Sequence, residues 1–217
     1  MPAHNEGSRI VAVVTAARAH LPVLVVDDGS TDDTAAAAGA AGATVLRQVP
    51  NQGKGAALAA GFRWALERGC EAVVTLDADG QHDPAEIPTF LAARSRGAPD
   101  LVIGYREFRD MPPARRAANL VGGRVLSWAL GRRIRDNQSG YRLIGRRLMG
   151  AMTESRESGF EFEIEMVVLC AHRGWSLEWV PISTIYAGEK SHIQPLHHAV
   201  HFARTAWRAR RSAPRGE

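Results

Sequence analysis

Short apolar runs alternate with longer amphipathic stretches through the first half of the chain. The apolar runs are three to five residues long and rich in Val and Leu, which is typical of strands that are buried on both faces. Amphipathic stretches with helical periodicity separate them, and an Ala-rich stretch follows a capping-box-like signal at Ser30 and Asp33. Strands are thus expected at 23–26, 44–46, 72–76 and 101–103, and helices at 35–43, 53–68 and 83–97. This alternation predicts an α/β fold with a mostly parallel, doubly wound sheet.

The second half of the chain is patterned less regularly. It predicts helices at 114–130 and 162–172, and strand-like segments at 139–144, 176–180 and 183–186, the last two on either side of Pro181. Residues 1–193 are expected to form one domain, which a basic amphipathic segment at 194–217 follows. Such a segment is typical either of a helix in a membrane interface or of a terminal helix packed on its own domain.

The chain begins without the apolar run that normally opens a parallel α/β fold. Asn5 and Glu6 already look like the start of a helix. We therefore predict a truncated first strand, and we expect that the true start of the protein lies further upstream. The alternative is a protein that lacks the first strand. The apolar side chains and the unpaired backbone groups of the neighbouring strand would then be exposed at the sheet edge.

Composition and charge narrow the class of protein. The 217 residues include 27 basic and 23 acidic side chains, with a net charge of +4. Residues 106–147 hold 11 arginines against 3 acidic residues, whereas residues 1–105 are net acidic. This distribution favours separate sites of opposite charge over a uniform groove for nucleic acid. Two cysteines, and no apolar run near the ~18 residues of a membrane span, predict a cytoplasmic protein without disulfides.

Two aspartates follow the expected strand at 72–76. Asp77 and Asp79 lie at its carboxyl end, where open α/β sheets bind ligands. Their carboxylates, together with the Gln81 carbonyl, would suit Mg²⁺ or Mn²⁺, which keep other coordination positions for water and phosphate oxygens. An Asp-x-Asp pair is equally typical of a polar turn. The pattern alone leaves both interpretations open.

A second acidic loop and a glycine-flanked lysine are further candidates. Asp27 and Asp28 end the expected strand at 23–26, where a carboxylate can bind base N–H groups or ribose hydroxyls, although the pair also suits a turn before a helix. Lys54 opens a helix between two glycines, which predicts an anion site. The chain has neither the Walker A spacing nor a G-x-G-x-x-G fingerprint, which argues against a nicotinamide or flavin dehydrogenase.

Five short motifs occur in an order that resembles one enzyme family. They are Pro2-Ala3-His4-Asn5-Glu6, Val26-Asp27-Asp28-Gly29-Ser30-Thr31-Asp32, Asn51-Gln52-Gly53-Lys54-Gly55, Asp77-Ala78-Asp79-Gly80-Gln81 and Asp136-Asn137-Gln138-Ser139-Gly140-Tyr141-Arg142. Together they resemble the inverting family 2 glycosyltransferases with the A-type fold. The last motif, with Phe160-Glu161-Phe162-Glu163, is similar to the dolichyl/polyprenyl-phosphate mannose and glucose synthase branch. The resemblance runs from Pro2 to about Pro195.

The resemblance implies a role for each motif. A divalent metal that bridges the nucleotide diphosphate would be held by Asp77, Asp79 and Gln81, with Asp79 among the catalytic residues. Nucleotide-sugar contacts are implied for Pro2, Ala3, Asn5, Glu6, Asp27, Asp28, Lys54, Asp77 and Lys190. Acceptor-phosphate contacts are implied for Arg106, Arg116, Ser139 and Arg142, of which Arg106 and Arg142 are also catalytic candidates. A contact with the sugar hydroxyls is implied for one of three glutamates, Glu161, Glu163 or Glu165.

The function that the resemblance implies is transfer of a hexose from a nucleotide sugar to a polyprenyl phosphate, at the inner face of the cytoplasmic membrane. GDP-mannose is the first choice of donor and UDP-glucose the second, and nucleic acid is not a partner. A phosphate acceptor is already anionic at pH 7 and needs no strong base, and the chain offers no Ser/His/Asp or Cys/His constellation. Two alternatives stay open. One is a hydroxyl acceptor with a base among the three glutamates, and the other is nucleotide binding without turnover.

Overall fold

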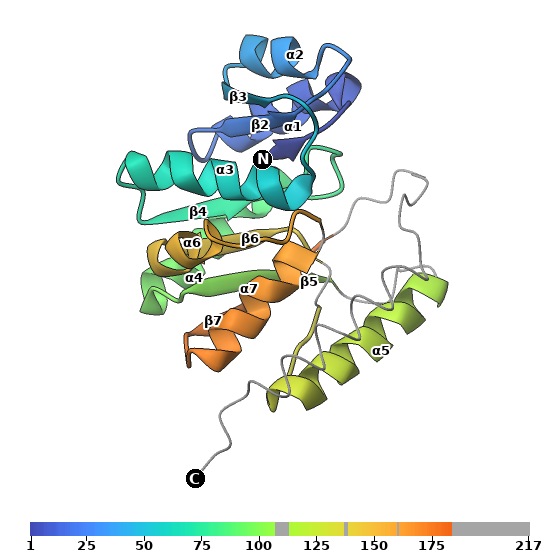
Figure 1. The fold of residues 1–217 in the computed structure, drawn as a ribbon, viewed down its shortest axis with the longest axis vertical. Helices are drawn as coiled ribbons and strands as arrows, with labels where there is room; N and C mark the ends of the chain where they lie inside the picture. Colours follow the sequence, from blue (N-terminus) through green and yellow to red (C-terminus); the bar gives the residue numbers. More distant parts are fainter. Residues whose placement is uncertain (107–112, 137–138, 160, 184–217) are drawn as a thin grey trace.

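The computed structural model describes residues 1–106, 113–136, 139–159 and 161–183. Within these residues the strands form two sheets (Figure 1). The first sheet is parallel and has the order β1-β2-β3, with β1 at Pro2–Ala3, β2 at Leu24–Asp28 and β3 at Thr44–Gln48. Its strands are connected by α1 (Gly7–Arg18) and α2 (Thr34–Ala40), and α3 (Lys54–Glu67) leads on to the second sheet.

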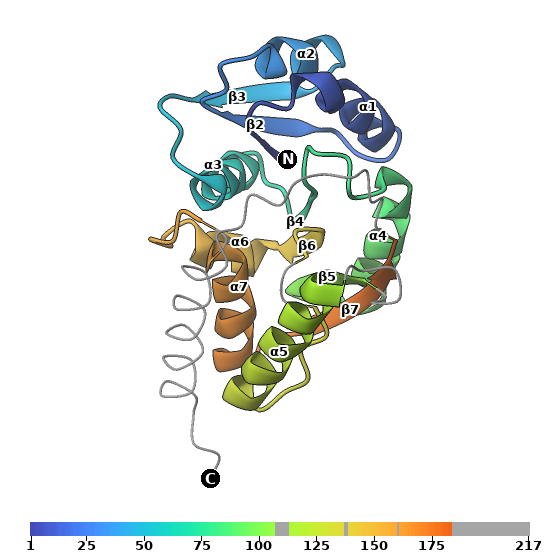
Figure 2. The same cartoon turned by 90° about the vertical axis from the view of Figure 1, so that its right-hand side faces the viewer.

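The second sheet is mixed. Its order is β4-β6-β5-β7, with β4 at Ala72–Thr75, β6 at Arg142–Gly145, β5 at Leu101–Arg106 and β7 at Leu177–Ile182. β5 and β7 are parallel, and β6 is antiparallel to β4 and β5. The helices of this half are the short 3₁₀ helix η1 (Pro84–Glu86), α4 (Ile87–Gly97), α5 (Pro113–Leu130), α6 (Arg146–Met152) and α7 (Glu161–His172). Figure 2 shows α4 on one side of the sheet and α7 on the other.

Both faces of the second sheet are buried. On one face Ile103 belongs to a cluster with Phe62 of α3 and Phe162 of α7. On the other face Val102 belongs to a cluster with Phe90 of α4. Neighbouring residues of a strand point to opposite faces, so the continuous apolar run of β5 contributes to two cores at once.

The predicted α/β fold is confirmed, and the expected strands at 23–26, 44–46, 72–76 and 101–103 coincide with β2 to β5. Two local predictions are wrong. The strand predicted at 176–180 does not end before Pro181: β7 continues through it to Ile182, because β7 lies at the edge of its sheet and an edge strand tolerates a residue without an N–H. Of the segment predicted at 183–186, Ser183 follows β7 and the other residues lie outside the described part of the chain. Ser30 caps no helix: α2 begins at Thr34, and the Ser30 hydroxyl instead accepts a hydrogen bond from the backbone N–H of Asn5.

A short first strand is present as the two residues of β1. Pro2 pairs with Val26 and Ala3 with Asp27, in parallel register. The amino group of Met1 continues this edge and donates to the Leu24 carbonyl at 2.9 Å. The amphipathic segment predicted at 194–217 lies outside the described residues. None of the described helices combines the length and the apolar character that a bilayer crossing requires.

Candidate active site

Charged residues gather at the carboxyl ends of β2, β4 and β5. Asp28 is the last residue of β2, Asp77 follows β4 by two residues, and Arg106 is the last residue of β5. Open α/β sheets bind ligands at this edge. We therefore build the candidate site from the loops that leave these three strands.

Asp28 fixes the loop that leads into α3. Its two carboxylate oxygens accept hydrogen bonds from the backbone N–H groups of Gln52 and Gly53, each at 2.8 Å. Gly53 has φ +94°, and a Cβ at this residue would lie 2.5 Å from the Ser158 carbonyl oxygen. Because only glycine fits both constraints, Asp28 and Gly53 together fix where α3 begins, and with it the position of Lys54.

The loop after β1 is tied to the loop after β2. Asn5 donates its backbone N–H to the Ser30 hydroxyl, and its side-chain carbonyl accepts from the backbone N–H of Thr31, both at 2.9 Å. The next residue, Glu6, donates its backbone N–H to the Thr34 hydroxyl at 2.8 Å. The structure thus places the predicted Asn5 and Glu6 against the loop that follows Asp28, and this contact is held at several points.

Lys54 lies between two acidic side chains. Its Nζ is 2.7 Å from Asp77 Oδ1 and 3.2 Å from Glu163 Oε1. A Cβ on Gly140 would lie within 3.0 Å of an atom of each of these three side chains, which shows how closely they converge. Burial alone would raise the pKa of Asp77, but the charge of Lys54 lowers it to about 2. Burial would lower the pKa of Lys54, but Asp77 and Glu163 together raise it above its ordinary value.

His82 packs beneath the loop of residues 77–81, which we call the acidic loop. The sequence analysis missed this residue. Its side chain is buried, and its Nδ1 accepts a hydrogen bond from the backbone N–H of Asp77 at 3.2 Å. Burial lowers the pKa of His82 to about 4, and the charge of Asp77 offsets this only in part. The imidazole is therefore neutral at pH 7. The available signal was its position directly after Gln81, in a motif otherwise assigned to metal binding.

The predicted metal donors lie in one tight loop. Gly80 has φ +81°, and the backbone N–H of Gln81 donates to Asp79 Oδ1 at 3.0 Å. Asp77 and Asp79 are both half-buried. Within the described ranges no three His, Cys, Asp or Glu side chains are grouped around one point. Two carboxylates and one carbonyl fit Mg²⁺ or Mn²⁺, because these cations retain water and phosphate oxygens as their other ligands.

Arg106 is held in a fixed orientation by Asp136. Its Nε and Nη2 donate to the two oxygens of Asp136 at 2.7 and 3.0 Å, and Asp136 is fully buried. Asn119 of α5 donates to Asp136 Oδ1 at 3.2 Å. A bidentate pair of this kind fixes the plane of the guanidinium. The motif of Asp136 signalled its importance, but no local signal pointed to Asn119, whose contact depends on how α5 packs.

Three predicted residues are not at the open edge of the sheet. Asp27 is fully buried, and its carboxylate pairs with Arg47 at 3.0 Å. Arg142 is also fully buried and donates to the backbone carbonyls of Ser139 and Glu163, so it joins β6 to α7. The Ser139 hydroxyl is buried as well, and in the described part of the chain neither it nor Arg142 Nη2 has a hydrogen-bond partner.

The remaining predicted residues lie at different places. Arg116 is exposed on α5, and Lys190 falls outside the described residues. Among the three glutamates of α7, Glu163 faces Lys54, whereas Glu165 accepts a hydrogen bond from the Ser155 hydroxyl. A helix with 3.6 residues per turn separates the two side chains in this way.

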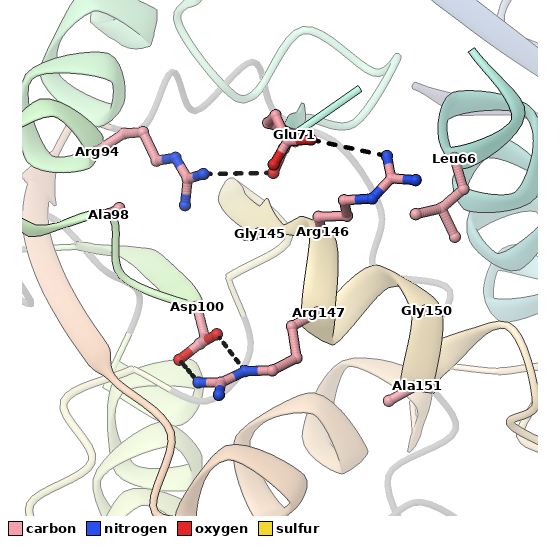
Figure 3. A pocket seen from close by; sticks show the side chains of 10 residues that line it. All are labelled: Leu66, Glu71, Arg94, Ala98, Asp100, Gly145, Arg146, Arg147, Gly150 and Ala151. Carbon is pink, nitrogen blue, oxygen red and sulfur yellow. Dashed lines mark hydrogen bonds and ion pairs between the residues drawn. The ribbon is translucent and has the colours of Figure 1, made fainter. Parts of the chain in front are cut away.

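A hollow of about 610 Å³ lies at the other edge of the sheet, where β5 begins and β6 ends (Figure 3). Its charged lining consists of Arg94, Arg146, Arg147, Glu71 and Asp100. Arg147 makes a bidentate pair with Asp100 at 3.0 and 2.6 Å, and Ser176 donates to the same carboxylate. These contacts join the residues directly before β5 and β7 to α6, so we assign this hollow a structural role.

The comparisons with known proteins agree with this geometry. The family described as Glycosyl transferase family 2 matches residues 1–152. The chain is 33% identical over 199 residues to the polyprenol monophosphomannose synthase of Mycolicibacterium smegmatis, a match that covers 84% of this chain and 75% of that protein. It is also 33% identical over 200 residues to the undecaprenyl-phosphate mannosyltransferase of Micrococcus luteus, with 85% and 82% covered.

Solved structures show the same fold. One is the glucosyl-3-phosphoglycerate synthase of Mycobacterium tuberculosis in complex with Mn²⁺ and UDP-glucose. It superimposes with a TM-score of 0.73 at 24% sequence identity, over 98% of this chain and 78% of that one. Since the family match covers more than half of the sequence, and the acidic loops lie where this fold binds ligands, the chain belongs to glycosyl transferase family 2 and is a glycosyltransferase.

Proposed function

We propose that this glycosyltransferase moves a hexose, with inversion, from a nucleotide sugar to a polyprenyl phosphate. The observation that carries the proposal is Arg106, clamped by Asp136 at the same sheet edge as Asp77 and Asp79. An acidic loop suits a metal-bound diphosphate, and a fixed guanidinium suits an anionic acceptor. Two similar proteins are named for this class of acceptor. Their names also favour mannose, so GDP-mannose is the first donor to test and UDP-glucose the second.

The donor half of the proposed site is formed by the first sheet and the acidic loop. Mg²⁺ or Mn²⁺, held by Asp77, Asp79 and Gln81, would stabilise the charge that develops on the leaving diphosphate. Lys54 would add a cation beside it. The nucleoside would lie against Asp28 and the loop after β1, which the hydrogen bonds of Asn5 and Glu6 hold in place.

The acceptor half is formed by the arginines. One phosphate oxygen of the acceptor bonds to the anomeric carbon as the bond from that carbon to the diphosphate breaks on the opposite face, which inverts the configuration. Because the acceptor is already ionised, no base is required, and Glu163 is in any case paired with Lys54. Arg106 and Arg116 would contact the phosphate, and the buried Arg142, which donates to the carbonyls of Ser139 and Glu163, would hold the backbone of these two residues in place.

The surface of α5 supports a lipid acceptor. Val121 and Trp128 are 60% and 58% exposed, and the exposed Arg124 lies between them on the same side of the helix. Exposed apolar and basic side chains on one helix face are typical of contact with an anionic membrane surface. We therefore propose a peripheral position at the cytoplasmic face of the membrane.

A transfer assay tests the proposal. The full chain is incubated with Mn²⁺, labelled GDP-mannose or UDP-glucose, and a short-chain polyprenyl phosphate, and label is measured in the organic phase. We expect transfer with one of the donors, its loss in Asp79→Ala, and a strong decrease in Arg106→Ala. Arg96→Ala, which removes an exposed arginine of α4, is the matched control. Transfer to free hydroxyl acceptors alone would refute the proposal.

A further inference from the structure

The ammonium group of Lys54 lies where a bound cation would also be attracted. It contacts Oδ1 of Asp77, a proposed metal ligand, and it also contacts Glu163. The Lys54 and Glu163 side chains are 20% and 6% exposed. Water therefore screens these charges poorly, and their interactions are strong.

A divalent cation and an ammonium group compete for one carboxylate. A metal ion on Asp77 repels a positive charge that lies 2.7 Å from the same group, so metal binding has to weaken the contact between Lys54 and Asp77. A largely buried ammonium that leaves its counter-ion needs another anion, because an unpaired buried charge is costly. Glu163 is already within 3.2 Å of Lys54 and is not among the proposed metal ligands.

We propose that Lys54 competes with the divalent cation for Asp77, and that Glu163 is the positioning residue that receives Lys54 when the cation binds. This inference rests on the metal site of the proposed function. Before the donor arrives, Lys54 neutralises the acidic loop and holds it to α3. Once the cation is bound, Lys54 pairs with Glu163 and lies beside the diphosphate.

The surroundings of Glu163 suit this role. Its backbone carbonyl accepts a hydrogen bond from the buried Arg142, and the preceding Phe162 packs against Phe62 of α3 with ring centroids 6.0 Å apart. The first turn of α7 is therefore fixed beside Lys54. Gly140 faces the same three charged groups without a side chain and is held by a hydrogen bond from the Thr75 hydroxyl to its carbonyl, at 2.9 Å. The ammonium therefore lies within reach of both carboxylates, with no intervening side chain from Gly140.

The test measures Mn²⁺ affinity of the full chain without nucleotide, from the electron paramagnetic resonance signal of free Mn²⁺. Lys54→Met removes the competitor and should tighten binding roughly tenfold. Glu163→Gln leaves Lys54 with Asp77 as its partner and should weaken binding roughly fivefold. Asp79→Asn should abolish specific binding, and Glu67→Gln, which changes an exposed glutamate at the end of α3, should leave it unchanged.

The double variant Lys54→Met/Glu163→Gln separates this inference from a direct effect of Glu163 on the metal. Without Lys54 there is no ammonium to receive, so Glu163→Gln should no longer weaken binding. An equal weakening with and without Lys54 would overturn the inference, as would unchanged or weaker binding in Lys54→Met. Circular dichroism checks folding, and if Glu163→Gln does not fold, Lys54→Met alone decides.

The transfer assay keeps the two proposals apart. If the wild type transfers sugar and binds Mn²⁺ through Asp79, but Lys54→Met does not bind it more tightly, only the competition is refuted. If the Mn²⁺ affinities change as expected while no sugar reaches polyprenyl phosphate, the competition stands and the proposed acceptor is refuted.

Discussion

The buried, neutral His82 predicts how stability depends on pH. Its Nδ1 accepts the backbone N–H of Asp77, and its ring lies 5.1 Å from that of Tyr141. A proton on Nδ1 would remove this hydrogen bond and place a positive charge in a buried position, where the nearby Asp77 carboxylate offsets the cost only in part. The folded protein therefore resists a proton that the unfolded chain takes up readily. We expect the free energy of unfolding to decrease as the pH falls from about 7 to 4.

The size of this effect follows from the pKa of His82. The folded value is about 4 and the ordinary value is 6.5. Between these values the unfolded chain binds one more proton than the folded protein, so stability is fully present above pH 6.5 and is lost towards pH 4. At about 1.4 kcal/mol for each pH unit, the loss is about 3 kcal/mol. For a domain with 5–15 kcal/mol of stability this is a large fraction.

Urea unfolding followed by tryptophan fluorescence measures the effect at pH 7, 6, 5 and 4. The variant His82→Asn keeps an acceptor near Nδ1 but cannot titrate, so the wild type should lose about 3 kcal/mol more than this variant across the range. The comparison also cancels the Met1 amino group, whose pKa burial lowers to about 5. His20→Asn, at an exposed histidine, is the matched control and should follow the wild type. Parallel pH profiles of the wild type and His82→Asn would refute the reasoning.

Three further predictions test other parts of the site. Asp136→Asn loosens Arg106 and should lower kcat/KM for polyprenyl phosphate roughly 10–100-fold in initial-rate assays. The Mn²⁺ affinity should stay unchanged, and an equal loss of both quantities would contradict a role confined to the acceptor. Gly53→Ala places a Cβ at positive φ and against the Ser158 carbonyl, and should cost about 2 kcal/mol in urea unfolding. Trp128→Asp should reduce co-sedimentation with anionic phospholipid vesicles severalfold, and undiminished pelleting would exclude α5 as the contact surface.

The sequence pattern predicted where strands lie more reliably than it predicted which strands pair with each other. β2 to β5 are apolar runs buried on both faces, and this local signal is strong. The placement of β6 between β4 and β5 joins residues that are some seventy positions apart in the chain, as in the pairing of Val73 with Ile144. No local property of either strand encodes such a pairing. The segment was expected to be strand-like, but its antiparallel direction and its place between β4 and β5 could not be predicted from periodicity.

The same distinction separates the site residues that were predicted from those that were missed. Asp28 and Asp77 were found because each follows an apolar strand directly. The contact of Glu163 with Lys54 depends on the packing of α7 against α3, which the spacing of glutamates in α7 does not reveal. Arg142 lies within β6 and shares a strand face with Ile144, so alternation along the strand was a signal that this arginine points into the core.

Individual buried ion pairs proved more informative than the net charge. Residues 1–105 are net acidic, and Lys54, one of only two lysines in the chain, contacts Asp77 of the acidic loop. Residues 106–147 are rich in arginine, and one of their three acidic residues, Asp136, is buried against Arg106. Exposed ion pairs contribute little to stability, whereas a buried charge is costly to leave without its partner. Both pairs lie at the sheet edge where donor and acceptor would meet, so the buried ion pairs identify the site where the net charge of a segment does not.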